Sequence, residues 1–101
     1  MQRMIRYTVK PESVADNERL VRQVYEALHA AKPAGLRYAT MRLDDGVSFV
    51  HLVSYANDEA NQTLTSLPAF KAFTAGIRER CATPPVTTDL QVVGAYGFFD
   101  D

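Results

Sequence analysis

The sequence predicts an α+β domain in which a four-stranded antiparallel sheet carries two helices on one face. The central signal is the stretch at residues 37–55, RYATMRLDDGVSFVHLVSY, which predicts two strands joined by a tight turn at Asp44, Asp45 and Gly46. An Asp-Gly pair between β-branched and aromatic runs is a strong hairpin signal, because glycine accepts the positive φ that such turns need. A helical pattern lies on each side of this hairpin, and another strand pattern lies beyond each helix.

The chain before the hairpin contains one strand and one long helix. Residues 3–10 alternate between apolar and polar types, which predicts a strand that ends at a proline. Ser13 is the expected N-cap of a helix that begins at Val14, because its hydroxyl can accept from a backbone N–H of the first turn. Apolar residues then recur every three or four positions, and Pro33 and Gly35 end the helix.

The chain after the hairpin repeats this order. Asn57 is expected to cap a short turn, and Ser66 followed by Pro68 to begin a second helix. The apolar stripe of that helix consists of Phe70, Phe73, Ile77 and Cys81. We expect a pair of prolines to end the helix and residues 86–99 to form the last strand. The order β-α-β-β-α-β is the split arrangement of the ferredoxin-like fold.

The composition indicates one globular domain that spans residues 1–101. The net charge is -1 and no basic block is interleaved with aromatic residues, which argues against nucleic acid as a partner. No apolar run approaches the roughly 20 residues of a membrane span, and the N-terminus lacks the apolar segment of a secretory signal. Cys81 is the single cysteine, which excludes an internal disulfide and a cysteine zinc cluster. We therefore expect a cytoplasmic protein without a membrane partner.

Both faces of the predicted sheet are apolar, although the helices cover only one of them. In the third strand the two sides are formed by Phe49, His51, Val53 and Tyr55 against Val50 and Leu52. In the last strand they are formed by Leu90, Val92, Tyr96 and Phe98 against Val93, Ala95 and Phe99. Soluble monomers rarely expose large apolar patches, so we expect a homodimer that packs sheet against sheet about a two-fold axis. The alternative is a twisted sheet of short strands that exposes only scattered apolar residues.

The segment at residues 54–73, SYANDEANQTLTSLPAFKAF, joins a capped turn to a Ser-Leu-Pro-Ala-Phe step into the second helix. With this segment and its order of elements, the chain resembles the dimeric α/β-barrel superfamily, and within it the antibiotic-biosynthesis-monooxygenase-like group. The resemblance covers nearly the whole chain and implies a dimeric α/β barrel. The group includes cofactor-independent oxygenases of polycyclic aromatic compounds, haem-degrading enzymes, isomerases and proteins without a known activity. It therefore implies a fold and a dimer, together with a range of chemistries.

His51 is the first candidate for chemistry, because it lies in the middle of an apolar strand. Apolar neighbours would desolvate the ring and lower its pKa, leaving a neutral imidazole that can act as a base, orient a substrate or bind a metal. The alternative is a structural histidine that is hydrogen-bonded within the sheet or at the dimer interface. His29 lies near the end of the first helix, where the helix dipole favours its charged form. Neither histidine has the spacing of a metal or haem ligand, so we expect no metal site and no cofactor.

The residues that share a face with His51 depend on the hairpin turn. A two-residue loop places a polar set beside it, namely Tyr38, Thr40 and Arg42. A three-residue loop places an apolar set there instead, namely Ala39 and Met41. A slip of one residue has this effect because alternate side chains of a strand point to opposite faces. The sequence leaves both registers open.

Two functions are compatible with these residues. The first is a small-molecule enzyme, a cofactor-independent monooxygenase-like protein that acts on an aromatic or polyketide-like compound. In it His51 is the catalytic base, and the substrate-binding residues are Tyr38, Arg42, Phe70 and Phe73. The second is a non-catalytic binding or structural dimer, in which phenylalanine side chains fill the same space. A cavity of roughly 300 Å³ or more, lined by His51 and a phenol, favours the enzyme.

Overall fold

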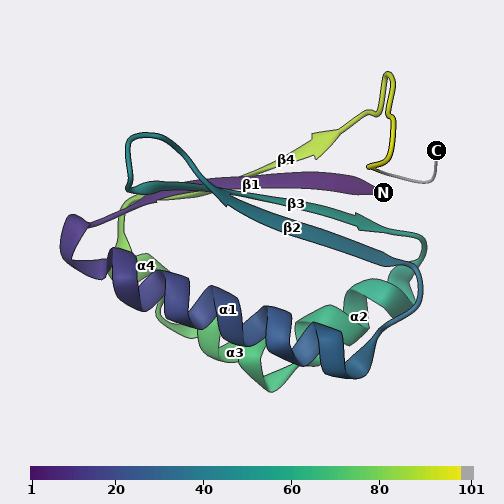
Figure 1. The fold of residues 1–101 in the computed structure, drawn as a ribbon, viewed down its shortest axis with the longest axis horizontal. Coiled ribbons are helices and arrows are strands. Elements are labelled where there is room, and N and C mark those ends of the chain that lie inside the picture. The colour runs from purple at the N-terminus through teal and green to yellow at the C-terminus, as the bar shows by residue number, and fades with distance from the viewer. Residues whose placement is uncertain (99–101) are drawn as a thin grey trace.

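The structure is a computed structural model that describes residues 1–98. Its strands are β1 (Gln2–Val9), β2 (Leu36–Arg42), β3 (Ser48–Tyr55) and β4 (Cys81–Leu90). Its helices are α1 (Val14–Ala31), α2 (Asp58–Ser66), α3 (Pro68–Ala75) and α4 (Ile77–Arg80), with a 3-10 turn, η1 (Pro11–Ser13), before α1. Neighbouring strands are antiparallel, in the order β2-β3-β1-β4. The helices form one layer against one face of the sheet (Figure 1), which confirms the predicted α+β fold.

The hairpin between β2 and β3 has the register that places Thr40 opposite His51. The loop that closes it spans residues 44–47, two more than we expected for this register. Within the loop, the Gly46 N–H donates to the Leu43 carbonyl at 3.0 Å. A loop of four residues gives the same register as a loop of two, because strand side chains alternate with a period of two. The polar set therefore lies on the His51 face.

We expect Gly46→Val to destabilise the domain through the backbone alone. Gly46 has a φ of +78°, and no atom lies within 4 Å of a Cβ built on it. The left-handed conformation costs a residue with a Cβ roughly 1–2 kcal/mol. Gly94→Val is the matched control, because Gly94 also has open space around it but has no positive φ. Urea unfolding should show the loss for Gly46→Val only, and equal stability of the three proteins would contradict the turn.

The helix boundaries differ from the prediction in three places. Ser13 precedes α1 as expected, but its side chain makes no capping hydrogen bond. Asn57 caps the nine-residue helix α2 instead of a short turn, accepting from a backbone N–H at 2.9 Å. The N-cap of α3 is Leu67 and not Ser66. Pro68 occupies the first helical position and restricts the residue before it to an extended conformation, which ends α2 and begins α3.

The last strand begins earlier than predicted. The residue pair Pro84 and Pro85, which we expected to end a helix, lies inside β4. β4 is an edge strand, and its register with β1 shifts twice near these prolines. Edge strands and bulges are the places where a sheet accepts residues without an N–H group. Cys81 is buried as the first residue of this strand, and the predicted stripe of the second helix ends before it.

The segment that follows β4 also differs from the prediction. Residues 91–98 lie outside the sheet, and in the ribbon they run as an irregular segment beyond the end of β4 (Figure 1). The expected alternation of Val92, Tyr96 and Phe98 across a strand is therefore wrong, and Leu90 alone of that set belongs to β4. Phe99, which we assigned to the opposite side, lies outside the described residues.

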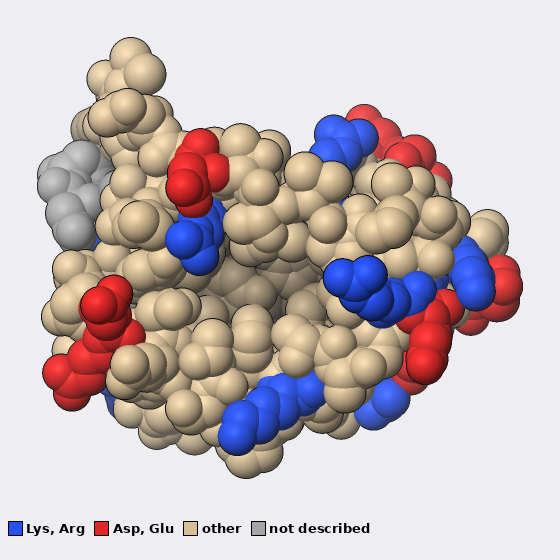
Figure 2. Space-filling model, turned by 180° about the vertical axis from the view of Figure 1, so that it is seen from behind, with Lys and Arg blue, Asp and Glu red and all other residues tan. Residues whose placement is uncertain are grey.

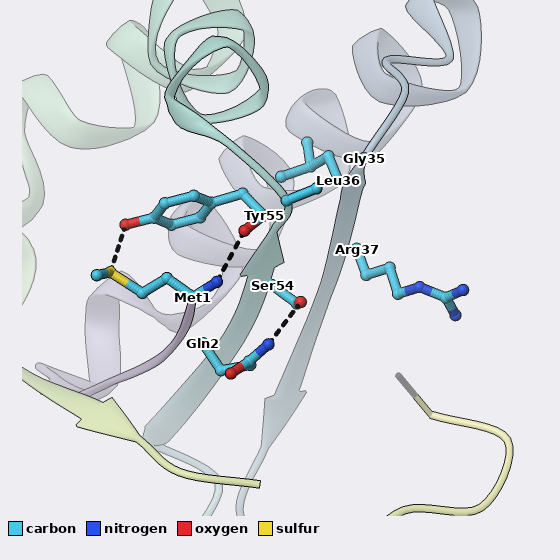
Figure 3. A pocket seen from close by; sticks show the side chains of 8 residues that line it. Met1, Gln2, Gly35, Leu36, Arg37, Ser54 and Tyr55 are labelled. Atoms are coloured by element: carbon cyan, nitrogen blue, oxygen red, sulfur yellow. Dashed lines mark hydrogen bonds between the residues drawn. The ribbon is translucent and has the colours of Figure 1, made fainter. Parts of the chain in front are cut away.

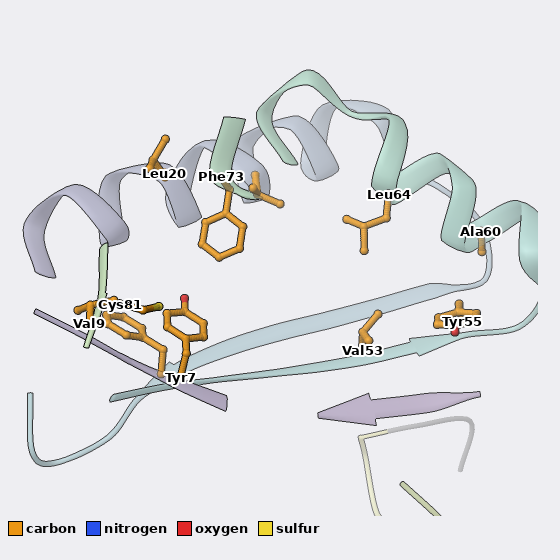
Figure 4. Packing of buried hydrophobic residues seen from close by; sticks show 11 residues of the cluster. Tyr7, Val9, Leu20, Val53, Tyr55, Ala60, Leu64, Phe73 and Cys81 are labelled. Carbon is orange, nitrogen blue, oxygen red and sulfur yellow. The ribbon is translucent and has the colours of Figure 1, made fainter. Parts of the chain in front are cut away.

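The core fills the space between the sheet and the helices (Figure 4). Tyr7 and Val53 point from the sheet toward the helices, and Phe73 and Leu64 point from the helices toward the sheet. The Tyr7 ring stacks on Phe49 with centroids 5.5 Å apart and lies 6.4 Å from the Phe73 ring. Burial of these large side chains supplies most of the driving force for folding. The polar groups considered next lie within this same layer.

Candidate functional site

His51 lies in the middle of β3 and is only 3% exposed. Thr40 is its neighbour across β2. The Phe73 ring of α3 lies over it, with the two ring centroids 5.3 Å apart. Both ring nitrogens are hydrogen-bonded to phenols, Nε2 to Tyr7 at 2.8 Å and Nδ1 to Tyr38 at 2.7 Å. Packing and hydrogen bonds therefore hold the imidazole in one orientation.

Beyond Tyr7, buried polar side chains continue from His51 to a guanidinium. Asn17 of α1 is fully buried and donates from Nδ2 to the Tyr7 oxygen at 2.9 Å. Arg80 of α4 donates from Nε to Asn17 Oδ1 at 3.1 Å. A terminal nitrogen of the same guanidinium donates to the Phe73 carbonyl at 2.7 Å. The polar chain, as we name this series, consists of Arg80, Asn17, Tyr7, His51 and Tyr38.

The hydrogen bonds of the polar chain have a direction that its chemistry determines. A guanidinium only donates, so Asn17 accepts through Oδ1 and its Nδ2 is the donor to Tyr7. The Tyr7 oxygen therefore accepts a hydrogen from Asn17 Nδ2. The hydrogen of the Tyr7 hydroxyl is donated in turn to His51 Nε2. In this arrangement the hydrogen of the buried Tyr7 hydroxyl has an acceptor, which it would lack if Nε2 carried a hydrogen. Nε2 is therefore the unprotonated nitrogen, and Nδ1 carries the hydrogen.

On the other side of the ring, two hydroxyls lie near Nδ1. The Tyr38 oxygen is 2.7 Å from it and the Thr40 oxygen 3.1 Å, and Thr40 is also bonded to the Tyr25 hydroxyl of α1 at 2.8 Å. His51 is the single hydrogen-bond partner of the Tyr38 hydroxyl among residues 1–98. Because Tyr38 accepts the hydrogen of Nδ1, its own hydrogen remains available to a further acceptor.

Burial sets the protonation states of this site. It raises the pKa of Tyr7 to about 12, against the opposing effects of the Asn17 hydrogen bond and the Arg80 charge. It also raises the pKa of Tyr38 and lowers the pKa of His51 to about 4. At neutral pH the phenols are protonated and the imidazole is neutral, which agrees with the direction of the hydrogen bonds.

We expect the protein to lose stability between pH 6.5 and about pH 4 because of His51. In the unfolded chain the imidazole takes up a proton near pH 6.5, whereas in the folded protein it stays neutral until about pH 4. The unfolded state binds more protons in this window, so the free energy of unfolding decreases as the pH falls, by roughly 3 kcal/mol in total. Urea unfolding at neutral pH and at about pH 4.5 should show most of this loss.

The substitution His51→Gln isolates this effect. It removes the titrating group, so the variant should be less stable at neutral pH but should show less further loss on acidification. His29→Gln is the matched control, because it makes the same substitution at a histidine that is exposed on α1. An unchanged acid dependence in His51→Gln would contradict a neutral, buried His51.

Tyr38 connects the polar chain to a cavity of about 150 Å³ between the sheet and the helices. Its apolar lining includes Ile5, Val53, Leu64 and Phe70. Its polar lining includes Arg3, Asn61, Thr65 and Thr87. Seen from behind, the molecule is hollowed near its middle, and charged side chains lie around the hollow (Figure 2). We name the cavity of about 150 Å³ that Tyr38 lines the Tyr38 cavity.

Neither His51 nor Phe73 lines the Tyr38 cavity. The cavity has half the volume that we set for an enzyme, and the histidine reaches it only through the Tyr38 hydroxyl. None of five cavities in residues 1–98, with volumes of about 150 to 480 Å³, has His51 in its lining. A substrate in this cavity would therefore meet a phenol and not an imidazole.

A larger cavity, about 480 Å³, lies elsewhere. It is formed where the ends of β1, β2 and β3 meet, and Figure 3 shows its side chains. The Met1 ammonium donates to the Tyr55 carbonyl at 2.8 Å, and Gln2 donates to the Ser54 hydroxyl at 3.3 Å. The Tyr55 hydroxyl lies 3.1 Å from the Met1 sulfur. This cavity contains no residue of the polar chain.

The structure brings together some of the predicted site residues and separates others. Tyr38 and Phe70 line one cavity, and Phe73 is buried behind His51. Arg42 shares the His51 face of β2, but its guanidinium donates to the Glu18 carboxylate of α1 at 2.6 Å. It therefore forms an exposed ion pair at the end of the strand and has no contact with the polar chain.

The predicted site contained two residues of the polar chain, His51 and Tyr38, and lacked the other three, Tyr7, Asn17 and Arg80. Asn17 had a usable signal, because it lies three and seven positions before Leu20 and Val24 and so continues the buried stripe of α1. An amide on a buried helix stripe needs polar partners, which are supplied from other elements. Arg80 had no such signal, since it lies at a helix–strand junction that the local pattern placed inside a helix.

Residues 2–76 match the family model for antibiotic biosynthesis monooxygenase. The chain belongs to this family. The match ends before Arg80 and therefore covers all other members of the polar chain. No curated protein matches the chain. Family membership confirms the resemblance inferred from the order of the elements.

Solved structures show the same fold. A protein from Mycobacterium tuberculosis has a TM-score of 0.76 at 19% identity, over 93% of this chain and 95% of that one. One from Caulobacter crescentus that bears the family's name has a TM-score of 0.75 at 22% identity, over 92% and 89%. One from Bacteroides thetaiotaomicron has a TM-score of 0.80 at 17% identity, over 92% and 89%. At these identities the likeness concerns the fold alone.

Residues 1–98 contain neither a cluster of metal-binding side chains nor a helix that could span a membrane. No group of three or more His, Cys, Asp or Glu side chains there is placed to hold a metal ion. No helix in this part of the chain has the length and apolar character to cross a membrane.

Proposed function

We propose that the protein binds a small ring compound in the Tyr38 cavity and stabilises an oxyanion that forms on it. The observation that carries this proposal is the position of Tyr38, which accepts from His51 Nδ1 at 2.7 Å and also lines the cavity. A protonated phenol with an available hydrogen is a good donor to an enolate or phenolate oxygen. Membership of the family supports a cofactor-independent, monooxygenase-like reaction at this site.

In such a reaction the substrate itself supplies the electrons that reduce O₂. A substrate that is acidic beside its carbonyl loses that proton to solvent water, and the carbon of the resulting enolate forms the bond to oxygen. Oxidation of a ring CH₂ to a carbonyl consumes one O₂ and releases its second oxygen atom as water. The protein then needs to hold the ring, exclude water and stabilise the negative oxygen. Phe70 would hold the ring and Tyr38 would donate to the oxygen.

His51 acts in this proposal as a positioning residue and not as the base that we first expected. Its lone pair at Nε2 accepts from Tyr7, and its Nδ1–H donates to Tyr38. Neither nitrogen is open to a substrate proton. Arg42 has no part in the proposal, because Glu18 binds its guanidinium.

Non-catalytic binding is the second candidate function. The closed packing around His51 and the small volume of the Tyr38 cavity favour it. The two candidates share the cavity and the hydrogen bond from Tyr38. They differ in whether a bound enolisable compound consumes oxygen.

We expect oxygen uptake when the protein meets single-ring enolisable ketones or phenols without added metal or flavin. Tyr38→Phe should lower the rate about a hundredfold, because it removes the donor to the oxyanion. Arg42→Gln, on the same face of β2, should leave the rate unchanged. An oxygen electrode measures both. Binding without uptake across the panel would favour the non-catalytic protein, and equal rates in Tyr38→Phe and the wild type would contradict the role of Tyr38.

We also propose a homodimer that forms through the sheet face without helices. Apolar side chains on this face and on the segment after β4 are exposed in the single chain, with Val93 at 99% and Tyr96 at 94%. Met41 of β2 and Val86 of β4 are exposed as well. Exposed apolar surface of this kind is typical of protein interfaces, and a second copy is the simplest cover.

Light scattering at low micromolar concentration should give about twice the 11.3 kDa mass of the chain. Val86→Lys should lower the measured mass toward that of one chain, because it places a charge on the outer sheet face. Gln23→Lys is the control, since Gln23 is exposed on α1 in the helix layer. A monomeric wild-type protein at this concentration would refute the dimer.

A further inference from the structure

We infer that Arg80 and Asn17 set the direction of every hydrogen bond in the polar chain, and that this direction makes the Tyr38 cavity selective for single-ring ligands with a hydrogen-bond-accepting oxygen. The location of the ligand rests on the proposed function. The direction of the bonds rests on the buried residues alone. No residue of the polar chain beyond His51 and Tyr38 was assigned a role by the sequence.

The direction begins at Arg80, because a guanidinium has donors and no acceptor. Arg80 is buried, and no carboxylate among residues 1–98 pairs with it. Its partners are the Asn17 amide oxygen, the Phe73 carbonyl and the Phe73 ring, whose centroid is 5.3 Å from the guanidinium carbon. The amide oxygen of Asn17 is thus committed to Arg80, which leaves only its NH₂ group to face Tyr7.

The direction of each later hydrogen bond follows from the first one. Tyr7 accepts from Asn17 and donates to His51 Nε2, and His51 donates from Nδ1 to Tyr38. Donors that themselves accept a hydrogen bond become stronger donors. The positive charge of Arg80 acts in the same sense, since it lowers the pKa of Tyr7 against the effect of burial. The series therefore ends in a polarised O–H group at Tyr38.

The Tyr38 hydroxyl, at the end of the series, determines which ligand groups can bind. A carbonyl, enolate or phenolate oxygen can accept the Tyr38 hydrogen. A ligand hydroxyl that must itself donate finds no acceptor at Tyr38, because Nδ1–H already occupies the phenol oxygen. A cavity of about 150 Å³ accommodates one benzene ring, and the Tyr38 cavity has this volume. Arg3 and Asn61 in its lining can form hydrogen bonds with polar substituents of the ring.

The substitution Asn17→Asp should reverse the polar chain while preserving its shape. A carboxylate at this position would accept from Arg80 through one oxygen and from the Tyr7 hydroxyl through the other. The Tyr7 oxygen would then accept from His51 Nε2–H, and Nδ1 would become the acceptor. Tyr38 would have to donate its hydrogen to Nδ1, and its donor would no longer be available to a ligand.

The tautomer of His51 tests the direction of the bonds. Nitrogen-15 NMR at neutral pH should show a protonated Nδ1 in the wild type and a protonated Nε2 in Asn17→Asp. Gln23→Glu adds the same charge to the exposed side of α1 and should leave the wild-type tautomer in place. A protonated Nε2 in the wild type, or an unchanged tautomer in Asn17→Asp, would overturn the inference. The wild-type spectrum tests the direction of the hydrogen bonds even if the variant does not fold.

A ligand probe tests the selectivity. Ionised 4-nitrophenol is a single ring with an acceptor oxygen, and its absorbance reports binding. Its affinity should fall about tenfold or more in Tyr38→Phe and equally in Asn17→Asp, although the second variant retains Tyr38. Gln23→Glu should bind it as the wild type does. No binding to the wild type, or unaltered binding in Asn17→Asp, would refute the selectivity.

These results are separable from the proposed reaction. The expected tautomers and probe affinities together with no oxygen uptake would support this inference and refute the oxygenase. Oxygen uptake with larger compounds but no affinity for 4-nitrophenol would support the oxygenase and refute the ligand class inferred here.

Discussion

The interior of this protein depends on the burial of one guanidinium, that of Arg80. A charge removed from water costs several kcal/mol unless its donors find acceptors. Here the acceptors are the carbonyl of Phe73 and the amide oxygen of Asn17, with the Phe73 ring beside them. These partners come from α1 and α3, so the cation holds the two helices and α4 in one arrangement. Because no partner is a carboxylate, its charge also acts on the tyrosine beyond.

The polar chain crosses every layer of the fold. Asn17 comes from a helix, and Tyr7, His51 and Tyr38 come from three adjacent strands. The ferredoxin-like arrangement brings β1 and β3 together at the centre of the sheet, so Tyr7 and His51 meet although 44 positions separate them. A displacement of either layer would leave buried polar groups without partners, which is costly. The chain therefore favours a single packing of helices on the sheet.

Tyr38 lies where this closed interior meets a cavity. His51 by itself has the properties of a structural histidine, since it is buried, neutral and bonded at both nitrogens. Tyr38, which is hydrogen-bonded to this histidine, also lines the Tyr38 cavity. The fold is shared with proteins at 13–22% identity, so function must reside in side chains such as these and not in the fold. A structural and a functional role for His51 are thus compatible.

Local patterns in the sequence determined most of the secondary structure and its order. Alternation in β1 and β3, the stripe of α1 and the Asp-Gly turn are short-range signals with periods that the backbone imposes. They also grouped His51 with Phe49, Val53 and Tyr55 on one face of β3. The two possible registers of the hairpin differed by one residue. In the observed register the polar set faces α1, and the Tyr25 hydroxyl of that helix is hydrogen-bonded to Thr40.

Tertiary structure alone decided the position of the last strand and the direction of the polar chain. Pro84 and Pro85 are helix-ending signals in local terms, but an edge strand with shifted register accepts them. The contact between Arg80 and Asn17 joins residues 63 positions apart. No periodicity encodes such a pair, because its partners meet only after the sheet and both helices have packed. His51 and Tyr38 were therefore visible in the sequence, whereas their buried partners and the direction of the hydrogen bonds depended on the folded arrangement.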